Sequence, residues 1–150
     1  MSIWWSLHLR REAASVPLAR RLLIGTMESA GVDPEISYDI SVALSEACAN
    51  AVEHGGDTDR GKSTEAYRVT AYLDGEKCRI EVTDSGPGFP SGRGRAPLRP
   101  SPSDAEHGRG LCLIQELADH VHIGSSVRGG AVVSFDKILK WREGTPLLAT

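Results

Sequence analysis

The chain has 150 residues, of which 40% are hydrophobic and 25% are charged, and its formal net charge is −3. This composition is typical of a folded domain with a buried core and excludes a disordered chain. The acidic balance argues against direct nucleic-acid binding, and no apolar run approaches the roughly 18 residues that a membrane-spanning helix needs. We therefore expect a single cytoplasmic domain over residues 1–150, with its core at about 3–141.

The first elements expected along the chain are a strand and a helix. Residues 3–10 are rich in strand-forming residues, and Trp5, Leu7 and Leu9 fall on one side. Ser15 is followed by Val16-Pro17, so we expect Ser15 to cap a helix that ends at Gly31. The apolar stripe predicted for this helix consists of Leu18, Leu22, Leu23 and Met27.

A second helix is predicted from Asp33-Pro34 to about His54, because a capping carboxylate followed by proline is a strong start signal. Its apolar face consists of Ile36, Ile40, Ala43, Leu44, Ala47 and Ala51, with Cys48 on the flank. Glu46 and Asn50 are four residues apart and therefore stand one above the other beside this face. On spacing alone, a solvated polar face explains the pair better than a metal ligand with a neighbouring base.

Two strands follow, at 67–73 and 78–84, joined by a turn at Asp74-Gly75. The parity of the second strand places Asp84 on the same side as Cys78, Ile80 and Val82. A carboxylate on the core side of a strand is unfavourable unless it has a partner, so Asp84 is a candidate binding residue.

Glycines and prolines dominate the segment after Asp84. Gly86 and Gly88 flank Pro87, which permits close approach of a ligand to the backbone and equally fits a plain strand-ending turn. We expect residues 89–107 to form a mobile lid, whose arginines Arg93, Arg95 and Arg99 either meet phosphate or only add charge.

The last predicted elements are a helix and two strands. Gly108, Arg109 and Gly110 precede a helix expected from Leu111 to about Ala118, and glycines before a helix start can expose N–H groups to an anion. Strands are expected around Val121–Ile123 and at 131–135, separated by a turn at 129–130.

Three motifs stand in order: Glu46-x-x-x-Asn50, Asp84-x-Gly86-x-Gly88 and Gly108-x-Gly110-Leu111. Together they resemble the GHKL (Bergerat-fold) ATP-binding family over about 36–135, and the wording around Glu46 and Asn50 is most similar to RsbW-type anti-sigma-factor serine kinases. The resemblance implies an α/β two-layer sandwich, with a mixed, mostly antiparallel sheet, helices on one face and a mobile lid.

The resemblance also implies roles for single residues. Asn50 would ligate Mg²⁺, and Glu46 would be the general base for an attacking hydroxyl. Asp84 would accept a hydrogen bond from the adenine amino group. Backbone approach and phosphate binding would fall to Gly86, Gly88, Gly108, Arg109, Gly110 and Leu111.

One position departs from the family pattern, because Ala131 stands where a threonine commonly assists adenine binding. The function implied is ATP-dependent phosphorylation of a STAS-type anti-anti-sigma partner by a protein that also sequesters a sigma factor and so regulates transcription. The alternative is an ATP-binding partner-switching module without phosphoryl transfer, and the presence of Glu46 favours the kinase. A second copy of the chain is a further candidate partner, which could use apolar surface on the first helix.

Overall fold

The computed structural model describes residues 2–54, 66–84, 105–125 and 130–142. Five strands form one sheet in the order β1-β2-β3-β5-β4, and every neighbouring pair is antiparallel. The strands are β1 (Ile3–Arg10), β2 (Ala66–Leu73), β3 (Lys77–Asp84), β4 (His120–Ser125) and β5 (Ala131–Ile138). The helices are α1 (Ser15–Ala30), α2 (Pro34–His54) and α3 (Ala105–Leu117).

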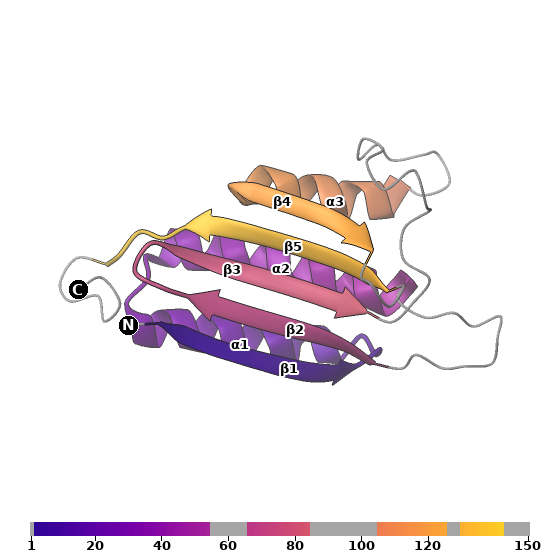
Figure 1. Cartoon of the computed structure of the whole chain (residues 1–150), viewed down its shortest axis with the longest axis horizontal. Helices are drawn as coiled ribbons and strands as arrows, with labels where there is room; N and C mark the ends of the chain where they lie inside the picture. Colours follow the sequence, from indigo (N-terminus) through magenta and orange to yellow (C-terminus); the bar gives the residue numbers. More distant parts are fainter. Residues whose placement is uncertain (1, 55–65, 85–104, 126–129, 143–150) are drawn as a thin grey trace.

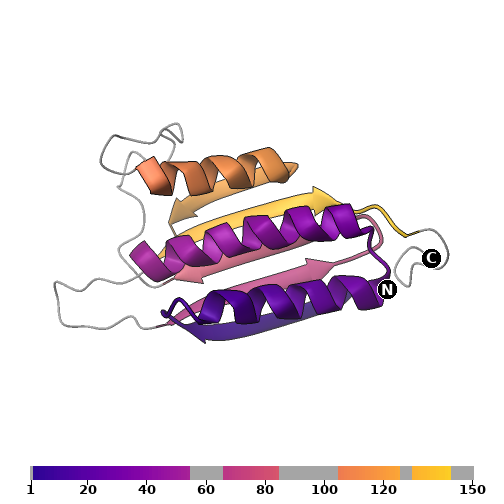
Figure 2. The ribbon, with the colours of Figure 1, turned by 180° about the vertical axis from the view of Figure 1, so that it is seen from behind.

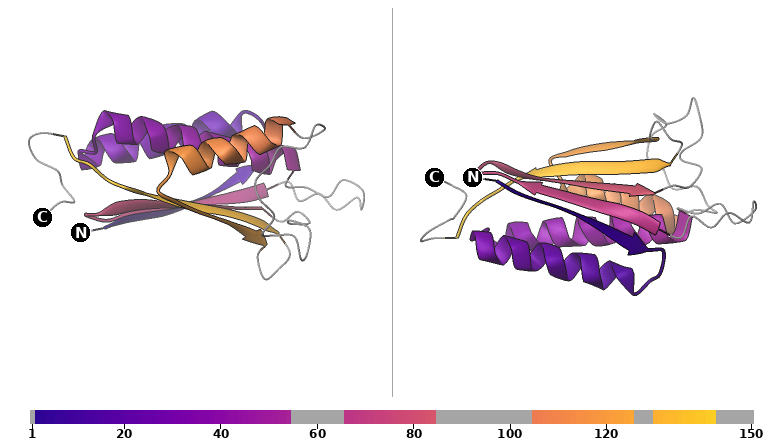
Figure 3. Two further views of the ribbon diagram at one scale, coloured as in Figure 1. Left: turned by 90° about the horizontal axis from the view of Figure 1, so that it is seen from above. Right: turned by 60° about the horizontal axis from the view of Figure 1, so that its bottom comes forward.

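The three described helices cover the same face of the sheet, and none of them lies on the other face (Figures 1, 2 and 3). The molecule therefore has two layers, as expected from the sequence. The core lies between the layers, where inward side chains of the strands such as Val69 and Ile80 meet α1 and α2. None of the described helices is both long and apolar enough to cross a membrane.

The β2–β3 hairpin forms where the sequence predicts it. The Asp74 carboxylate accepts the backbone N–H groups of Glu76 and Lys77 at 2.8 and 2.9 Å, which closes the turn. These hydrogen bonds, first that of Lys77, lower the pKa of Asp74. The register then places Tyr67 of β2 opposite Asp84 at the far end of β3.

Helix α1 differs from the prediction in two ways. Ser15 is not the cap, because the N-cap residue is Ala14 and its side chain makes no capping bond. Ser15 is instead buried, and its hydroxyl donates to the Glu12 carbonyl at 2.7 Å. The helix ends as expected at Gly31, whose φ of 87° suits a residue without a side chain.

The apolar stripe of α1 is also displaced from the predicted one. Leu18 and Leu22 are 54% and 41% exposed, whereas Leu23 and Met27 are fully buried. The remaining buried apolar positions of α1 are Ala19 and Ala30, so small side chains let this helix lie close to the sheet.

Helix α2 agrees with the prediction. Asp33 caps it, with one carboxylate oxygen accepting the Glu35 N–H at 2.8 Å, and it runs to His54. All the apolar residues expected on its inner face are buried, and so is Cys48.

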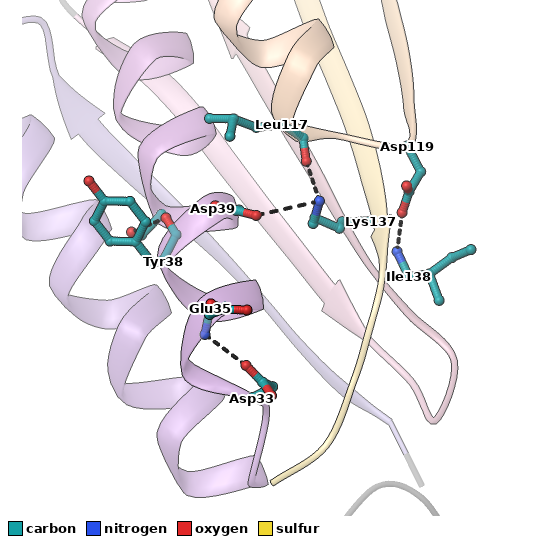
Figure 4. A network of polar contacts seen from close by, with 9 residues as sticks. Asp33, Glu35, Tyr38, Asp39, Leu117, Asp119, Lys137 and Ile138 are labelled. Atoms are coloured by element: carbon teal, nitrogen blue, oxygen red, sulfur yellow. Dashed lines mark hydrogen bonds and ion pairs between the residues drawn. The ribbon is translucent and has the colours of Figure 1, made fainter.

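The C-terminal ends of the three helices are each bonded by a cationic side chain from elsewhere in the chain. Neither α1 nor α3 has a basic residue in its own last turn. The bonds join Arg142 Nη2 to Glu28 O (2.8 Å), Arg11 Nη2 to Val52 O (2.8 Å) and Lys137 Nζ to Leu117 O (2.5 Å). Figure 4 shows the third of these, in which Lys137 also lies 3.7 Å from the Asp39 carboxylate of α2. Each cation supplies donors and positive charge at a helix end, where the last carbonyls lack a partner four residues further along the helix and the dipole is negative.

Candidate functional site

Glu46 and Asn50 lie one turn apart on the C-terminal half of α2. Both side chains are half-buried, while their neighbours Ala47 and Ala51 are buried in the core. The pair therefore stands at the edge of the core and not on a fully solvated helix face. This position fits residues that line a site.

The Glu46 carboxylate lies directly against α3. A Cβ placed on Gly110 would be only 3.1 Å from Glu46 Oε2, closer than ordinary van der Waals contact. The two helices pack against each other, so the fold brings the first and third sequence motifs together. A side chain at position 110 would therefore displace the Glu46 carboxylate by a few tenths of an ångström, a contact that spacing in the sequence does not reveal.

Helix α3 begins earlier than the sequence suggests. Its first residue is Ala105 and not Leu111, so Gly108, Arg109 and Gly110 lie within the helix. Only the first four N–H groups of a helix lack an internal partner, and Gly110 is the sixth residue of α3. The expectation that these glycines precede the helix start is therefore wrong.

The glycines are tolerated inside α3 because tertiary packing holds the helix. Leu111 and Ile114 are buried in the core. This packing offsets a helix penalty of about 1 kcal/mol for each interior glycine. The residue after Gly110, Leu111, anchors this part of α3 in the core.

Asp84 ends β3 on the inner side of the sheet. It is half-buried, and its Oδ1 accepts the backbone N–H of Ala131 at 3.1 Å. The expectation that a core-side carboxylate has a partner is thus confirmed. The bond to Ala131 comes from the main chain, so the absence of a threonine side chain at this position does not remove it.

Several predicted residues lie outside the described part of the chain. They are Gly86, Gly88, Arg93, Arg95, Arg99 and all of the expected lid before residue 105. The last three residues of that lid, 105–107, belong to α3.

Tyr67, which pairs with Asp84 in the sheet, carries a buried hydroxyl that the sequence patterns did not single out. The Tyr67 hydroxyl is 2.6 Å from Ser15 Oγ, and this bond joins β2 to the first turn of α1. Burial raises the pKa of the Cys48 thiol to about 12, and burial followed by the charge of Cys48 raises that of Tyr67. Both groups are neutral at physiological pH, so Cys48 is an unreactive core residue. The sequence could have indicated this bond, because the alternation of β2 places Tyr67 on the inner face and a buried tyrosine hydroxyl usually has a hydrogen-bond partner.

The oxygen-bearing side chains of the candidate site suit a cation that is bound mainly by the phosphates of a substrate. No group of three or more histidine, cysteine, aspartate or glutamate side chains gathers around a common point in the described residues. One carboxamide, Asn50, and one carboxylate, Glu46, stand together on α2. Mg²⁺ commonly binds through one or two such protein oxygens together with substrate phosphates, so the residues fit this ion.

Comparison with known proteins assigns the fold to a family. A family model described as the histidine kinase-like ATPase domain matches residues 9–137. The chain belongs to this family. Glu46, Asn50, Asp84 and Gly110 all lie within the matched span.

Curated relatives show which members of the family the chain is similar to. The chain is similar to the serine-protein kinase RsbW of Bacillus licheniformis, with 32% identity over 130 residues, 83% of this chain and 78% of the relative. It is also similar to an anti-sigma F factor of Thermoanaerobacter sp. (strain X514), with 30% identity over 115 residues, 74% of this chain and 78% of the relative. The resemblance to RsbW-type proteins noted in the sequence is confirmed.

Solved structures agree with the family. The structure of the RsbU and RsbW domains of Rv1364c from Mycobacterium tuberculosis matches with a TM-score of 0.63 and 25% identity, over 94% of this chain and 35% of that one. The SiaB–SiaC complex from Pseudomonas aeruginosa matches with a TM-score of 0.59 over 89% of each chain. At 12% identity the second likeness concerns the fold alone.

Proposed function

We propose that this protein is an ATP-dependent serine or threonine protein kinase that also acts as an anti-sigma factor. The observation that carries the proposal is the Glu46 carboxylate, held against Gly110 of α3 and one turn from Asn50. A general base must stand beside the phosphates, and the position of Glu46 at the contact between α2 and α3 supports this role. Relatives named serine-protein kinase and anti-sigma F factor support the same reading.

In this proposal each described site residue has one task. Asp84 accepts a hydrogen bond from the adenine amino group, while its Oδ1 holds the Ala131 N–H. Asn50 binds the magnesium ion of Mg-ATP, and the ion neutralises charge on the phosphates. Glu46 takes the proton from the attacking hydroxyl of the protein substrate.

The remaining assignments depend on the same nucleotide pose. Gly86 and Gly88 let the nucleotide approach the backbone. Gly108, Arg109, Gly110 and Leu111 would lie along the phosphates. Of these, only Gly108 is among the first four residues of α3, whose free N–H groups would offer the anion site.

The proposed partners are proteins. A sigma factor is bound and withheld, and a STAS-type anti-anti-sigma protein receives the phosphoryl group. Both would be met in the cytoplasm, where transcription takes place. Leu18 and Leu22 leave apolar surface exposed on α1, which is the surface expected to serve a partner or a second copy of the chain.

The experiment is incubation of the protein with γ-labelled ATP and candidate STAS proteins, followed by analysis of the labelled residue. We expect transfer to serine or threonine by the parent protein. Glu46→Gln should bind ATP but lose transfer, and Asn50→Ala should lose binding of Mg-ATP. Glu116→Gln removes an exposed carboxylate of α3 and is the matched control, with transfer unchanged.

Two results would count against the kinase. Parental transfer by Glu46→Gln would show that Glu46 is not the base. Nucleotide binding without label transfer to any STAS protein would favour the alternative, a partner-switching module that uses ATP only as a ligand.

A further inference from the structure

A hollow separate from the candidate kinase site lies between α1 and the first turns of α2. Its volume is about 270 Å³, and its walls are mostly apolar. Ile24 of α1 contributes one wall, and Val32 and Pro34, which lead into α2, contribute another. Figure 4 shows Tyr38, which also lines the hollow, extending from α2 on the side of α1, away from Asp39 and Lys137.

The hollow contains a buried hydroxyl group that lacks a partner. Ser37 is 6% exposed, and its Oγ makes no hydrogen bond to any described residue. Ser41 lines the same hollow, but its hydroxyl donates to the Tyr38 carbonyl at 2.7 Å. An unpaired buried hydroxyl is unfavourable. The Oγ atom itself is covered by neighbouring atoms, so Ser37 adds a hydrogen bond to a ligand once its side chain turns toward the hollow.

Charges of both signs border the hollow. Glu28 is an exposed carboxylate on the last turn of α1. Arg142 is held in place because its Nη2 donates to the Glu28 carbonyl at 2.8 Å and its backbone N–H donates to Gly31 O at 2.8 Å. The guanidinium has five N–H donors, and this bond uses one of them.

We propose that this hollow binds a free apolar α-amino acid. The two opposite charges at the rim suit a zwitterion, with the ligand carboxylate on Arg142 and its ammonium group on Glu28. The apolar side chain of the ligand lies against Ile24, Val32 and Pro34, and Ser37 donates its hydroxyl to the ligand carboxylate. Pockets for drug-sized ligands span roughly 300–1,000 Å³, so a volume of about 270 Å³ matches a molecule of amino-acid size.

The amino-acid site and the proposed ATP site are on different parts of α2. Ser37 and Asn50 are thirteen residues apart on one helix, which corresponds to roughly 20 Å. The two ligands therefore bind without competing. The inference does not depend on the proposed kinase activity, because it concerns residues at the other end of the helix.

The test is titration of the isotope-labelled full chain with leucine, isoleucine, valine and phenylalanine, followed by amide NMR. We expect at least one amino acid to give saturable shifts at residues 24–41 and at Arg142, unchanged by Mg-ATP. N-acetyl-leucine amide, which lacks both charges, should bind at least tenfold more weakly. Glu28→Gln should also weaken binding by about tenfold.

The Ser37→Ala variant separates a ligand contact from a structural role. Because the hydroxyl has no described partner in the free protein, Ser37→Ala should leave the unfolding midpoint unchanged or raise it, yet weaken amino-acid binding about tenfold. Ser45→Ala is the control, because Ser45 lies one turn beyond Ser41 along α2 and does not line the hollow, and it should not change binding. The proposal is overturned by the absence of saturable shifts with all four amino acids, by equal binding of N-acetyl-leucine amide, by competition with Mg-ATP, or by parental affinity in Ser37→Ala.

Discussion

Replacing Gly110 with alanine should slow phosphoryl transfer while making the protein more stable. Gly31 is the only described glycine with a positive φ, so the backbone at Gly110 accepts an alanine. The added Cβ would be 3.1 Å from Glu46 Oε2, and ordinary contact begins at 3.4 Å. The carboxylate or the helix must therefore move by about 0.3 Å.

The size of each effect follows from this displacement. A misplacement of 1 Å can lower catalysis by about a hundredfold, so on a logarithmic scale about 0.3 Å corresponds to a roughly fourfold loss of rate. Alanine in place of an interior helical glycine contributes about 0.5–1 kcal/mol to the free energy of unfolding. For a chain of this length, that gain corresponds to a rise in Tm of roughly 1–4 °C.

The assay pairs label transfer from γ-labelled ATP with urea or thermal unfolding of the same sample. Gly25→Ala is the matched control, because Gly25 also lies inside a helix and its added Cβ would meet nothing within 4 Å. It should raise stability by a similar amount and leave transfer unchanged. If Gly110→Ala transfers phosphate at the parental rate, the Glu46 carboxylate is not a positioned base and the contact is only packing.

Three further changes test the surrounding structure. Tyr67→Phe should lower the free energy of unfolding by about 1 kcal/mol in urea titrations, since it removes one buried hydrogen bond, and no loss would show that the bond contributes nothing. Burial raises the pKa of Cys48 and Cys78 from 9.0 in the unfolded chain to about 12 in the folded protein. The two neutral thiols therefore stabilise the folded state below pH 9. This contribution to the free energy of unfolding should be lost as the pH rises from 9 to 12. Alkaline unfolding titrations should show this slope, and replacing both thiols with alanine should reduce it. Arg11→Met should lower the free energy of unfolding by about 1–2 kcal/mol and speed amide exchange at the end of α2, because Val52 O loses its two donors, whereas unchanged exchange would contradict a capping role.

Where local signals in the sequence agree with one another, they predicted the structure. The limits and buried face of α2 follow from Asp33-Pro34 and a regular apolar spacing. The inward position of Asp84 follows from the alternation of β3, since a strand places every second side chain on the same face. The family and its two-layer architecture follow from the order of the three motifs.

The errors arose where neighbouring elements decide the outcome. The buried stripe of α1 includes Ala19 and excludes Leu18, because the helix packs the face that fits closely against the sheet. The size of the residues alone does not show which face this is. The two glycines Gly108 and Gly110 led to a predicted start of α3 that is too late. The packing of Leu111 and Ile114 stabilises a helix that includes both glycines. The contact between Glu46 and Gly110 depends on how two helices pack, which single-helix periodicity does not specify.

The cations at the helix C-termini make folding of the early part of the chain dependent on its last residues. Arg142 bonds a carbonyl of α1 that is 114 residues earlier, while Arg11 and Lys137 act across 41 and 20 residues. A fragment that stops after β5 would keep every described strand and helix, yet α1 would lose the Arg142 bond at its end and the amino-acid hollow would lose the charge of Arg142. We therefore expect this domain to unfold in one cooperative transition, and the helical hairpin of α1 and α2 to be weakly helical as an isolated peptide.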